Sequence, residues 1–182
     1  NSLKLPMLLL LIIGIFTGSF LIGKKTSKKG YIEGLDDEYS QYMTKEEWVK
    51  ANMFSVCLQS FHHLGLLRCF AIYSRYELGI SYYEFYNRLL DYIYSDSSKY
   101  IYGLFNMIRS KTEDTENSDW CYQKDIFSKV GWYFEEGAFL DMAYNSDIFW
   151  QEIKGFVDSL GIDEDIRNAL FDYQKSIIRL PN

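Results

Sequence analysis

The chain has 182 residues, a length that suits one globular domain. Its 48% hydrophobic and 18% aromatic content, with only 2 prolines, argues against disorder. Residues 1–29 carry five lysines and no acidic residue, whereas residues 30–182 carry 14 lysines and arginines against 25 acidic residues. Because phosphate binding needs clustered basic side chains, this acidic body excludes nucleic acid as its main partner.

The three cysteines are Cys57, Cys69 and Cys121. An odd number without regular spacing does not describe a disulfide framework. Reduced thiols in a cytoplasmic setting fit this pattern better.

Residues 5–23 form an apolar run, LPMLLLLIIGIFTGSFLIG, that contains no charge. As a helix it would span about 28 Å, close to the thickness of the hydrocarbon layer. Four lysines follow the run and one precedes it, so the positive-inside rule would place the body in the cytoplasm. In this interpretation residues 1–29 are a transmembrane helix with a basic flank.

Two alternatives for the apolar run stay open. A cleaved signal peptide is one, although Thr17-Gly18-Ser19 makes a poor cleavage site. The other follows from the first residue, which is Asn rather than Met: the run would then be an internal segment of a fragment, or the product of a damaged reading frame.

Residues 30–43 are polar and read as a linker, and residues 44–182 as a helical domain. Thr44 and Glu47 form a capping box, which predicts a long helix from Lys45 to about Leu78. Gly65 is expected to kink or divide this helix, and Gly79 to end it.

A second capping box, Ser81 to Glu84, predicts the next helix. Its apolar residues recur at helical spacing. A third helix is expected over residues 99–109, followed by a polar loop over 111–119. The apolar residues of the second helix are Tyr82, Phe85, Tyr86, Leu89 and Ile93.

Residues 120–130 suggest a short helix, and residues 131–137 a turn that leads into another short helix over 138–142. Asn145 or Ser146 is expected to cap a further helix, which Gly161 ends. Its apolar stripe consists of Ile148, Phe149, Ile153, Phe156, Val157 and Leu160.

Asp163 is expected to cap the last helix. Its predicted buried face consists of Ile166, Leu170, Tyr173 and Ile177. No alternation typical of strands competes with these helices. The sequence therefore predicts an all-α fold, an irregular bundle of five to seven helices preceded by an N-terminal apolar helix.

The two histidines of the chain, His62 and His63, lie between Cys57 and Cys69. A metal site on one helix needs ligands three or four residues apart. Cys57 and His62 differ by about 140° around a helix, and His62 and Cys69 by about 10 Å along it. No pair can share one ion unless the helix breaks at Gly65 or ligands come from elsewhere.

Two other interpretations of the histidines are open. They flank a buried seam, or they make a polar contact to a partner domain. The seam would consist of Phe54, Leu58, Phe61 and Leu64.

Glu135 and Glu136 are adjacent acids that either form a general acid–base pair or cap the following helix. Adjacent helical residues point about 100° apart, which favours capping. A nucleophilic Cys57 or Cys69 would need a base within reach, which helical geometry does not supply. No catalytic residue and no metal ligand is therefore assigned.

Three passages resemble the C-terminal region of large radical SAM proteins that carry a cobalamin-binding domain. They are MTKEEWVKANMFSVCLQSFHHLGLLRCFAIYSRYELGISYYEFYNRLL (43–90), WYFEEGAFLDMAYNSDIFWQEI (132–153) and LFDYQKSIIRLP (170–181). The resemblance covers roughly residues 40–182. It implies parent enzymes that bind S-adenosylmethionine at a [4Fe-4S] cluster held by CxxxCxxC, with cobalamin on a Rossmann-like domain.

This chain departs from that machinery, because its cysteines are 12 and 52 residues apart and it has no DxHxxG motif. The resemblance therefore implies a non-catalytic C-terminal accessory domain or fragment. Its partner would be the radical SAM catalytic domain, in cis or lost, and it would pack on the catalytic barrel and help close the substrate side. The candidate residues for that contact are His62, His63, Arg75, Trp132, Glu135 and Glu136.

The beginning of the chain also departs from the family, since a membrane-length apolar run stands where a soluble approach with LPN.PM..P is expected. The alternative function is therefore a membrane-anchored cytoplasmic module that binds a protein partner through its aromatic residues. A third hypothesis is a stand-alone metal or thiol enzyme that uses Cys57, His62, His63 and Cys69.

Overall fold

The computed structural model describes residues 44–114 and 117–178. The apolar run and the linker lie outside the described residues, so the anchor, its alternatives and the domain boundaries stay predictions. Within the described part, no helix is long and apolar enough to cross a membrane. Contacts divide the chain between Trp48 and Val49, and the second of the two units contains nearly all the described residues.

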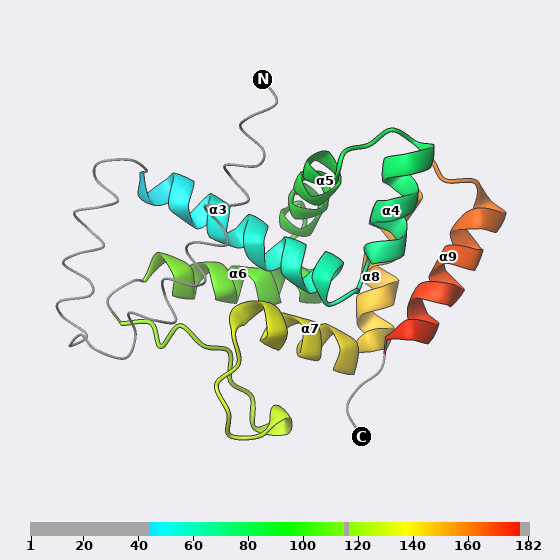
Figure 1. The fold of residues 1–182 in the computed structure, drawn as a ribbon. Coiled ribbons are helices and arrows are strands. Elements are labelled where there is room, and N and C mark those ends of the chain that lie inside the picture. The colour runs from blue at the N-terminus through cyan, green and yellow to red at the C-terminus, as the bar shows by residue number, and fades with distance from the viewer. Residues whose placement is uncertain (1–43, 115–116, 179–182) are drawn as a thin grey trace. The chain divides into compact units, whose positions relative to one another are not determined.

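The described residues form helices and connecting loops with no strand, which confirms the all-α class (Figure 1). Seven α-helices lie in this part of the chain, the upper end of the predicted range. They are α3 (Lys45–Leu58), α4 (Arg68–Glu77), α5 (Tyr82–Tyr94), α6 (Tyr100–Glu113), α7 (Phe134–Tyr144), α8 (Ser146–Asp158) and α9 (Glu164–Ile177). Two shorter elements accompany them, a π-helix, η1 (Gln59–His63), and a 3₁₀ turn, η2 (Asp125–Phe127).

The predicted capping boxes begin α3 and α5. Thr44 and Glu47 bond reciprocally: the Glu47 amide donates to the Thr44 hydroxyl over 3.2 Å, and the Thr44 amide to the Glu47 carboxylate over 2.8 Å. In α5 the Glu84 amide donates to Ser81 Oγ over 3.1 Å. These pairs satisfy backbone donors that the first helical turn leaves free.

The helix predicted from Lys45 to Leu78 is divided at Gly65, as expected. Gly65 has φ of +98°, a conformation that favours glycine, and it separates η1 from α4. Gly79, with φ of +70°, follows the end of α4 in the same way.

The core is aromatic, and Phe61 of η1 lies fully buried at its centre. Its ring stacks on Phe105 of α6 at 5.8 Å and on Phe149 of α8 at 6.2 Å. Phe85 of α5 meets Phe156 of α8 edge to face at 5.3 Å. Each fully buried ring of this kind stabilises the fold by roughly 1.5–3 kcal/mol.

The stretch between α6 and α8 corrects three predictions. Helix α6 runs to Glu113, one turn further than expected, and an Arg109–Glu113 ion pair of 2.8 Å lies in that turn. Residues 120–130 form an irregular loop with only η2 in place of a helix. Helix α7 begins at Phe134, so residues 134–137 of the segment expected to be a turn form its first helical turn.

The last helix corrects the prediction most strongly. Asp163 caps α9 as expected, since its carboxylate accepts from the Asp165 amide over 3.1 Å. The predicted buried face is instead largely exposed, at Ile166, Tyr173 and Ile177. The fully buried residue of α9 is Gln174.

In α8 the apolar stripe is buried as predicted, apart from Ile148, which is exposed. Asn145 stands at the N-cap position, yet its side chain does not cap the helix. It turns back to Asp141 of α7.

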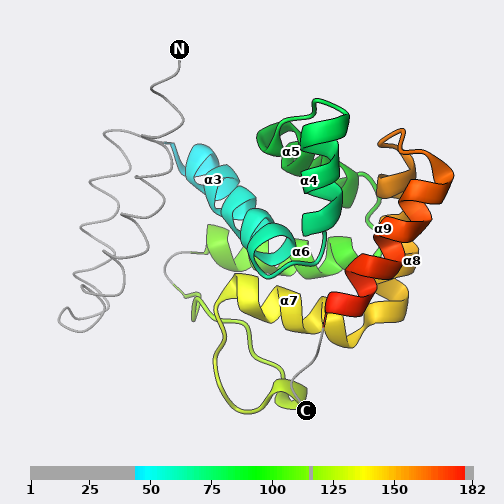
Figure 2. The same cartoon turned by 45° about the vertical axis from the view of Figure 1, so that its right-hand side comes forward.

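Helix α7 packs against η1, α6 and α8, and α4 packs against η1, α5 and α9. Helices α4 and α9 lie side by side and run in opposite directions, as both views show (Figures 1 and 2). The π-helix thus occupies the junction between the two groups of helices.

Candidate functional site

The π-helix η1 carries the two histidines. The Leu64 amide donates to the Gln59 carbonyl over 2.8 Å, which widens the last turn by one residue. Such turns occur frequently at functional sites. The guanidinium of Arg68 closes the end of the helix: its Nε donates to the His62 carbonyl over 2.6 Å, and its Nη2 donates to the His63 carbonyl.

His62 lies half-buried against two tyrosines of α5. Its Nδ1 forms a 2.9 Å hydrogen bond with the Tyr86 hydroxyl, and its ring meets Tyr82 edge to face at 5.1 Å. Burial, and then His63 and Arg68, lowers the pKa of His62 below its ordinary value of 6.5. Burial raises the pKa of Tyr86 well above its ordinary value, so this hydroxyl keeps its proton. The pair is therefore neutral at pH 7.

His63 is exposed, in contrast to its neighbour. The expected seam is only partly formed: Phe61 is buried, Phe54 and Leu58 are half-buried, and Leu64 is exposed. The π-turn causes this difference because it shifts Leu64 away from the face that an unbroken α-helix would bury.

The two acids lie in the first turn of α7, next to η1. The buried Ser60 hydroxyl donates to the Glu135 carbonyl over 2.9 Å and joins the two elements. Burial, and then Glu136, raises the pKa of Glu135 above its ordinary value. The two elements meet through the backbone carbonyl of Glu135, whereas the hydrogen bond of the His62 ring goes to Tyr86.

Trp132 and Arg75 lie apart from the histidines. The backbone of Trp132 forms a bridge with Tyr122, with bonds of 2.8 and 2.9 Å, and its indole donates to the Phe127 carbonyl over 3.2 Å. Trp132 therefore shapes the loop that leads into α7. Arg75 is exposed on α4, seven residues beyond Arg68.

A buried carboxylate in α7, Asp141, escaped the sequence analysis. It accepts hydrogen bonds from the Tyr122 hydroxyl, from Lys124 Nζ over 2.5 Å and from Asn145 Nδ2 over 2.7 Å. The signal was present, because an acid within the apolar stretch AFLDMA needs partners once it is buried. These contacts tie the loop to α7 and α8.

Gln174 of α9 was also missed. Its Nε2 donates to the Gly65 carbonyl, and its Oε1 accepts from the Cys69 amide over 2.9 Å. The side chain thus satisfies both sides of the turn between η1 and α4. Gln174 lies within the passage 170–181 that carries the resemblance, and it has a structural role in this contact.

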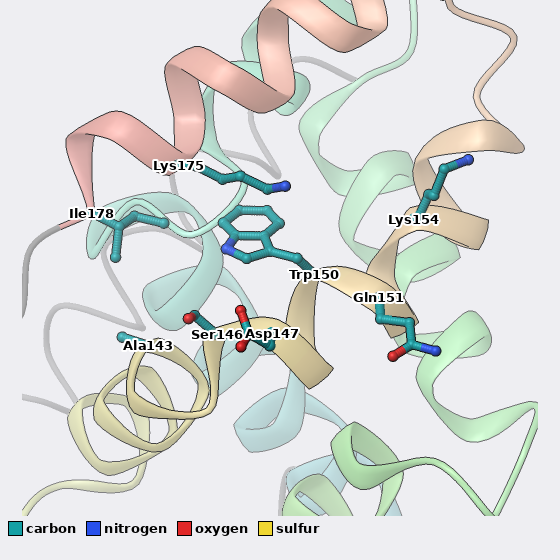
Figure 3. Close-up of a pocket in the computed structure, with 8 residues that line it drawn as sticks. All are labelled: Ala143, Ser146, Asp147, Trp150, Gln151, Lys154, Lys175 and Ile178. Atoms are coloured by element: carbon teal, nitrogen blue, oxygen red, sulfur yellow. The ribbon is translucent and has the colours of Figure 1, made fainter.

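An open cleft of about 610 Å³ lies between α8 and α9 (Figure 3). Lys175 lies over the Trp150 ring, 5.6 Å from its centroid, and Lys154 is paired with Asp158 at 2.7 Å. The volume would suit a small molecule. The lining residues are Ala143, Ser146, Asp147, Trp150, Gln151, Lys154, Lys175 and Ile178.

Across the residues that the structure describes, no group of three or more His, Cys, Asp or Glu side chains could hold a metal ion. Burial is the main reason that the pKa of Cys57 and of Cys69 is raised. Both are therefore thiols rather than thiolates at neutral pH.

No protein-family profile matches the sequence. A search of curated proteins found similarity to the cobalamin-dependent radical SAM methyltransferase TokK of Streptomyces tokunonensis, 25% identical over 135 residues. The match takes in 66% of this chain and 20% of the relative. The similarity is distant and partial, and the chain corresponds to about one fifth of the relative's length.

Proposed function

We propose that this chain is the helical accessory region of a cobalamin-dependent radical SAM enzyme, non-catalytic itself, which packs on the catalytic barrel. The observation that carries the proposal is the match between two thirds of the chain and one fifth of a relative described in those terms. The matched segment is one fifth of the relative, so it is one part of a larger enzyme. S-adenosylmethionine, the [4Fe-4S] cluster and cobalamin would then bind to the remaining parts.

The junction of η1 and α7 is the surface that we assign to this contact. It presents the exposed His63 imidazole and the half-buried Glu135 carboxylate. Because burial raises the pKa of Glu135, a cationic or hydrogen-bond-donating partner would stabilise its charged form. The Ser60 bond holds the Glu135 backbone, so replacing the side chain leaves the helix anchored.

The test uses the enzyme that carries this region together with its catalytic barrel. His63→Ala and Glu135→Ala should lower turnover or raise the KM, while the matched control Glu164→Ala, an exposed acid in the first turn of α9, should change neither. Unchanged kinetics in both junction variants would refute this assignment of the surface.

The alternative, a membrane-anchored interaction module in the cytoplasm, depends on residues 5–23. Two assays on membranes from expressing cells would distinguish the two functions. In carbonate extraction, full release of the chain would contradict an anchor. In a protease-protection assay, protection of the N-terminus alone would support an anchor.

A further inference from the structure

Helices α4 and α9 carry an unusual share of exposed apolar surface. They are joined by the Phe70–Phe171 ring contact of 4.8 Å and by the bond from the Cys69 amide to Gln174. Six of the large apolar side chains that are more than a third exposed in the described part belong to this pair or its caps. They are Ile72, Tyr76, Leu78, Ile166, Tyr173 and Ile177.

Helical geometry places most of these residues on one side of the pair. Ile72 and Tyr76 are four residues apart and point about 160° away from the buried Ser74. On α9 the exposed residues Ile166, Tyr173 and Ile177 follow one another at spacings of seven and four, beside the stripe that contains Gln174, and the half-buried Leu170 lies between the first two. Because the buried residues of both helices point toward the core, we expect the two stripes to face the solvent on the side away from it. The α4–α9 face is defined as Ile72, Tyr76, Ile166, Leu170, Tyr173 and Ile177.

The contacts between the helices also set their alignment. Cys69 and Phe70 lie level with Gln174 and Phe171. Counting in opposite directions from there, Ile72 lies level with Leu170, and Tyr76 with Ile166. Each apolar residue of α4 therefore has an apolar residue of α9 at its own height.

The two edges of the face carry opposite charges. Arg75 lies on the outer edge of α4 and Asp165 on the outer edge of α9, at nearly the same height. A two-fold axis parallel to the helices would bring α4 of one copy onto α9 of the other. Ile72 would then meet Leu170, Tyr76 would meet Ile166, and Arg75 would meet Asp165 at both edges.

We propose that the α4–α9 face binds a second copy of this chain, forming a two-fold symmetric four-helix contact. An apolar, tyrosine-rich centre with charges at the rim is the usual anatomy of a protein interface. Self-complementary charge at the edges selects an isologous pair over an unrelated partner. This inference does not depend on the proposed enzymatic context.

The matched pair Ile166→Asp and Ile148→Asp tests the face. Both residues are the third of their helix and follow an aspartate, and they are 40% and 43% exposed. An acid is favourable at this helical position, so neither change should unfold the chain. Sedimentation velocity of the full chain should show a dimer for the wild type and for Ile148→Asp. Ile166→Asp should weaken association roughly tenfold or more, because it buries an unpaired charge.

A charge exchange gives a second readout. Arg75→Glu and Asp165→Arg should each weaken the dimer, and the double variant should restore it, because the exchanged charges meet again across the axis. Circular dichroism checks that each variant keeps its helices. A monomeric wild type at high concentration, association that survives Ile166→Asp, or a double variant weaker than both single variants would overturn the proposal.

Discussion

Gly137 is the fourth residue of α7, and the ring of Tyr122 lies directly against it. A Cβ added at Gly137 would lie 2.3 Å from Tyr122 Cγ, 2.4 Å from its Cβ and 2.5 Å from its Cδ1. These atoms form the root of the ring, which the backbone bridge to Trp132 holds in place. Gly137→Ala must therefore displace Tyr122 as a whole.

The displacement should cost about 1.5–5 kcal/mol of unfolding free energy. Overpacking of this kind costs about 1–3 kcal/mol. Moving Tyr122 also breaks its hydrogen bond to the buried Asp141 carboxylate, which adds about 1.5–3 kcal/mol. The better helix propensity of alanine returns about 1 kcal/mol.

Gly103 provides the matched control, because it too is the fourth residue of its helix and an added Cβ would meet nothing within 4 Å. Gly103→Ala should stabilise the chain by about 0.5–1 kcal/mol. Urea unfolding followed by circular dichroism measures both variants. If Gly137→Ala were as stable as the wild type or more so, the packing of Tyr122 on α7 would be refuted.

Gln174→Ala should destabilise the chain by about 2–4 kcal/mol in urea unfolding, because it leaves the Gly65 carbonyl and the Cys69 amide without their partner. A loss of stability below about 0.5 kcal/mol would contradict this role. Glu152→Ala should cost about 1–2 kcal/mol in thermal unfolding, since its carboxylate accepts from the first two amides of α6 over 2.7 and 2.9 Å, and Glu152→Gln should cost less. The pKa of His62 is lowered in the folded chain, so the unfolded chain takes up this proton first, and stability should fall as the pH drops from about 6.5 through the folded pKa. His62→Gln should remove that part of the slope, and an unchanged slope would show that another group causes it.

Glu135 has the opposite effect on the pH dependence of stability, so its contribution can be distinguished from that of His62. Its pKa is raised in the folded chain, so its unfavourable contribution appears as the pH rises above the ordinary value of 4.5. The His62 slope is therefore best measured between about pH 7.5 and 5.5, as the difference between the wild type and His62→Gln.

Features that depend on neighbours in sequence could be predicted. The caps at Thr44, Ser81 and Asp163 and the breaks at Gly65 and Gly79 are local, and the structure has all of them. Each needs only a hydroxyl or carboxylate near free amides, or a glycine with positive φ.

Features that depend on partners far away in the sequence could not be predicted. Gly137 reads as a turn residue, but it serves the close approach of Tyr122. Gln174 is buried in place of the apolar stripe of α9 because its partners lie 105 and 109 residues away. Tertiary contacts of this kind override helical periodicity.

The candidate site also has one feature that could be predicted from the sequence and others that could not. The spacing of His62, His63 and the cysteines argued against a metal site on a single helix. Tyr86 and Arg68, the partners of the histidine pair, could not be read from spacing, because the π-turn decides where each imidazole points.

The accessory role is tested most directly by the affinity of this chain for the catalytic portion of its relative. The Streptomyces tokunonensis methyltransferase would be prepared with its cofactors, once intact and once without the matched fifth of its chain, and titrated with the 182-residue protein. The account predicts binding to the shortened enzyme and not to the intact one, whose own segment occupies the place. Equal binding to both forms, or none to the shortened form, would contradict it.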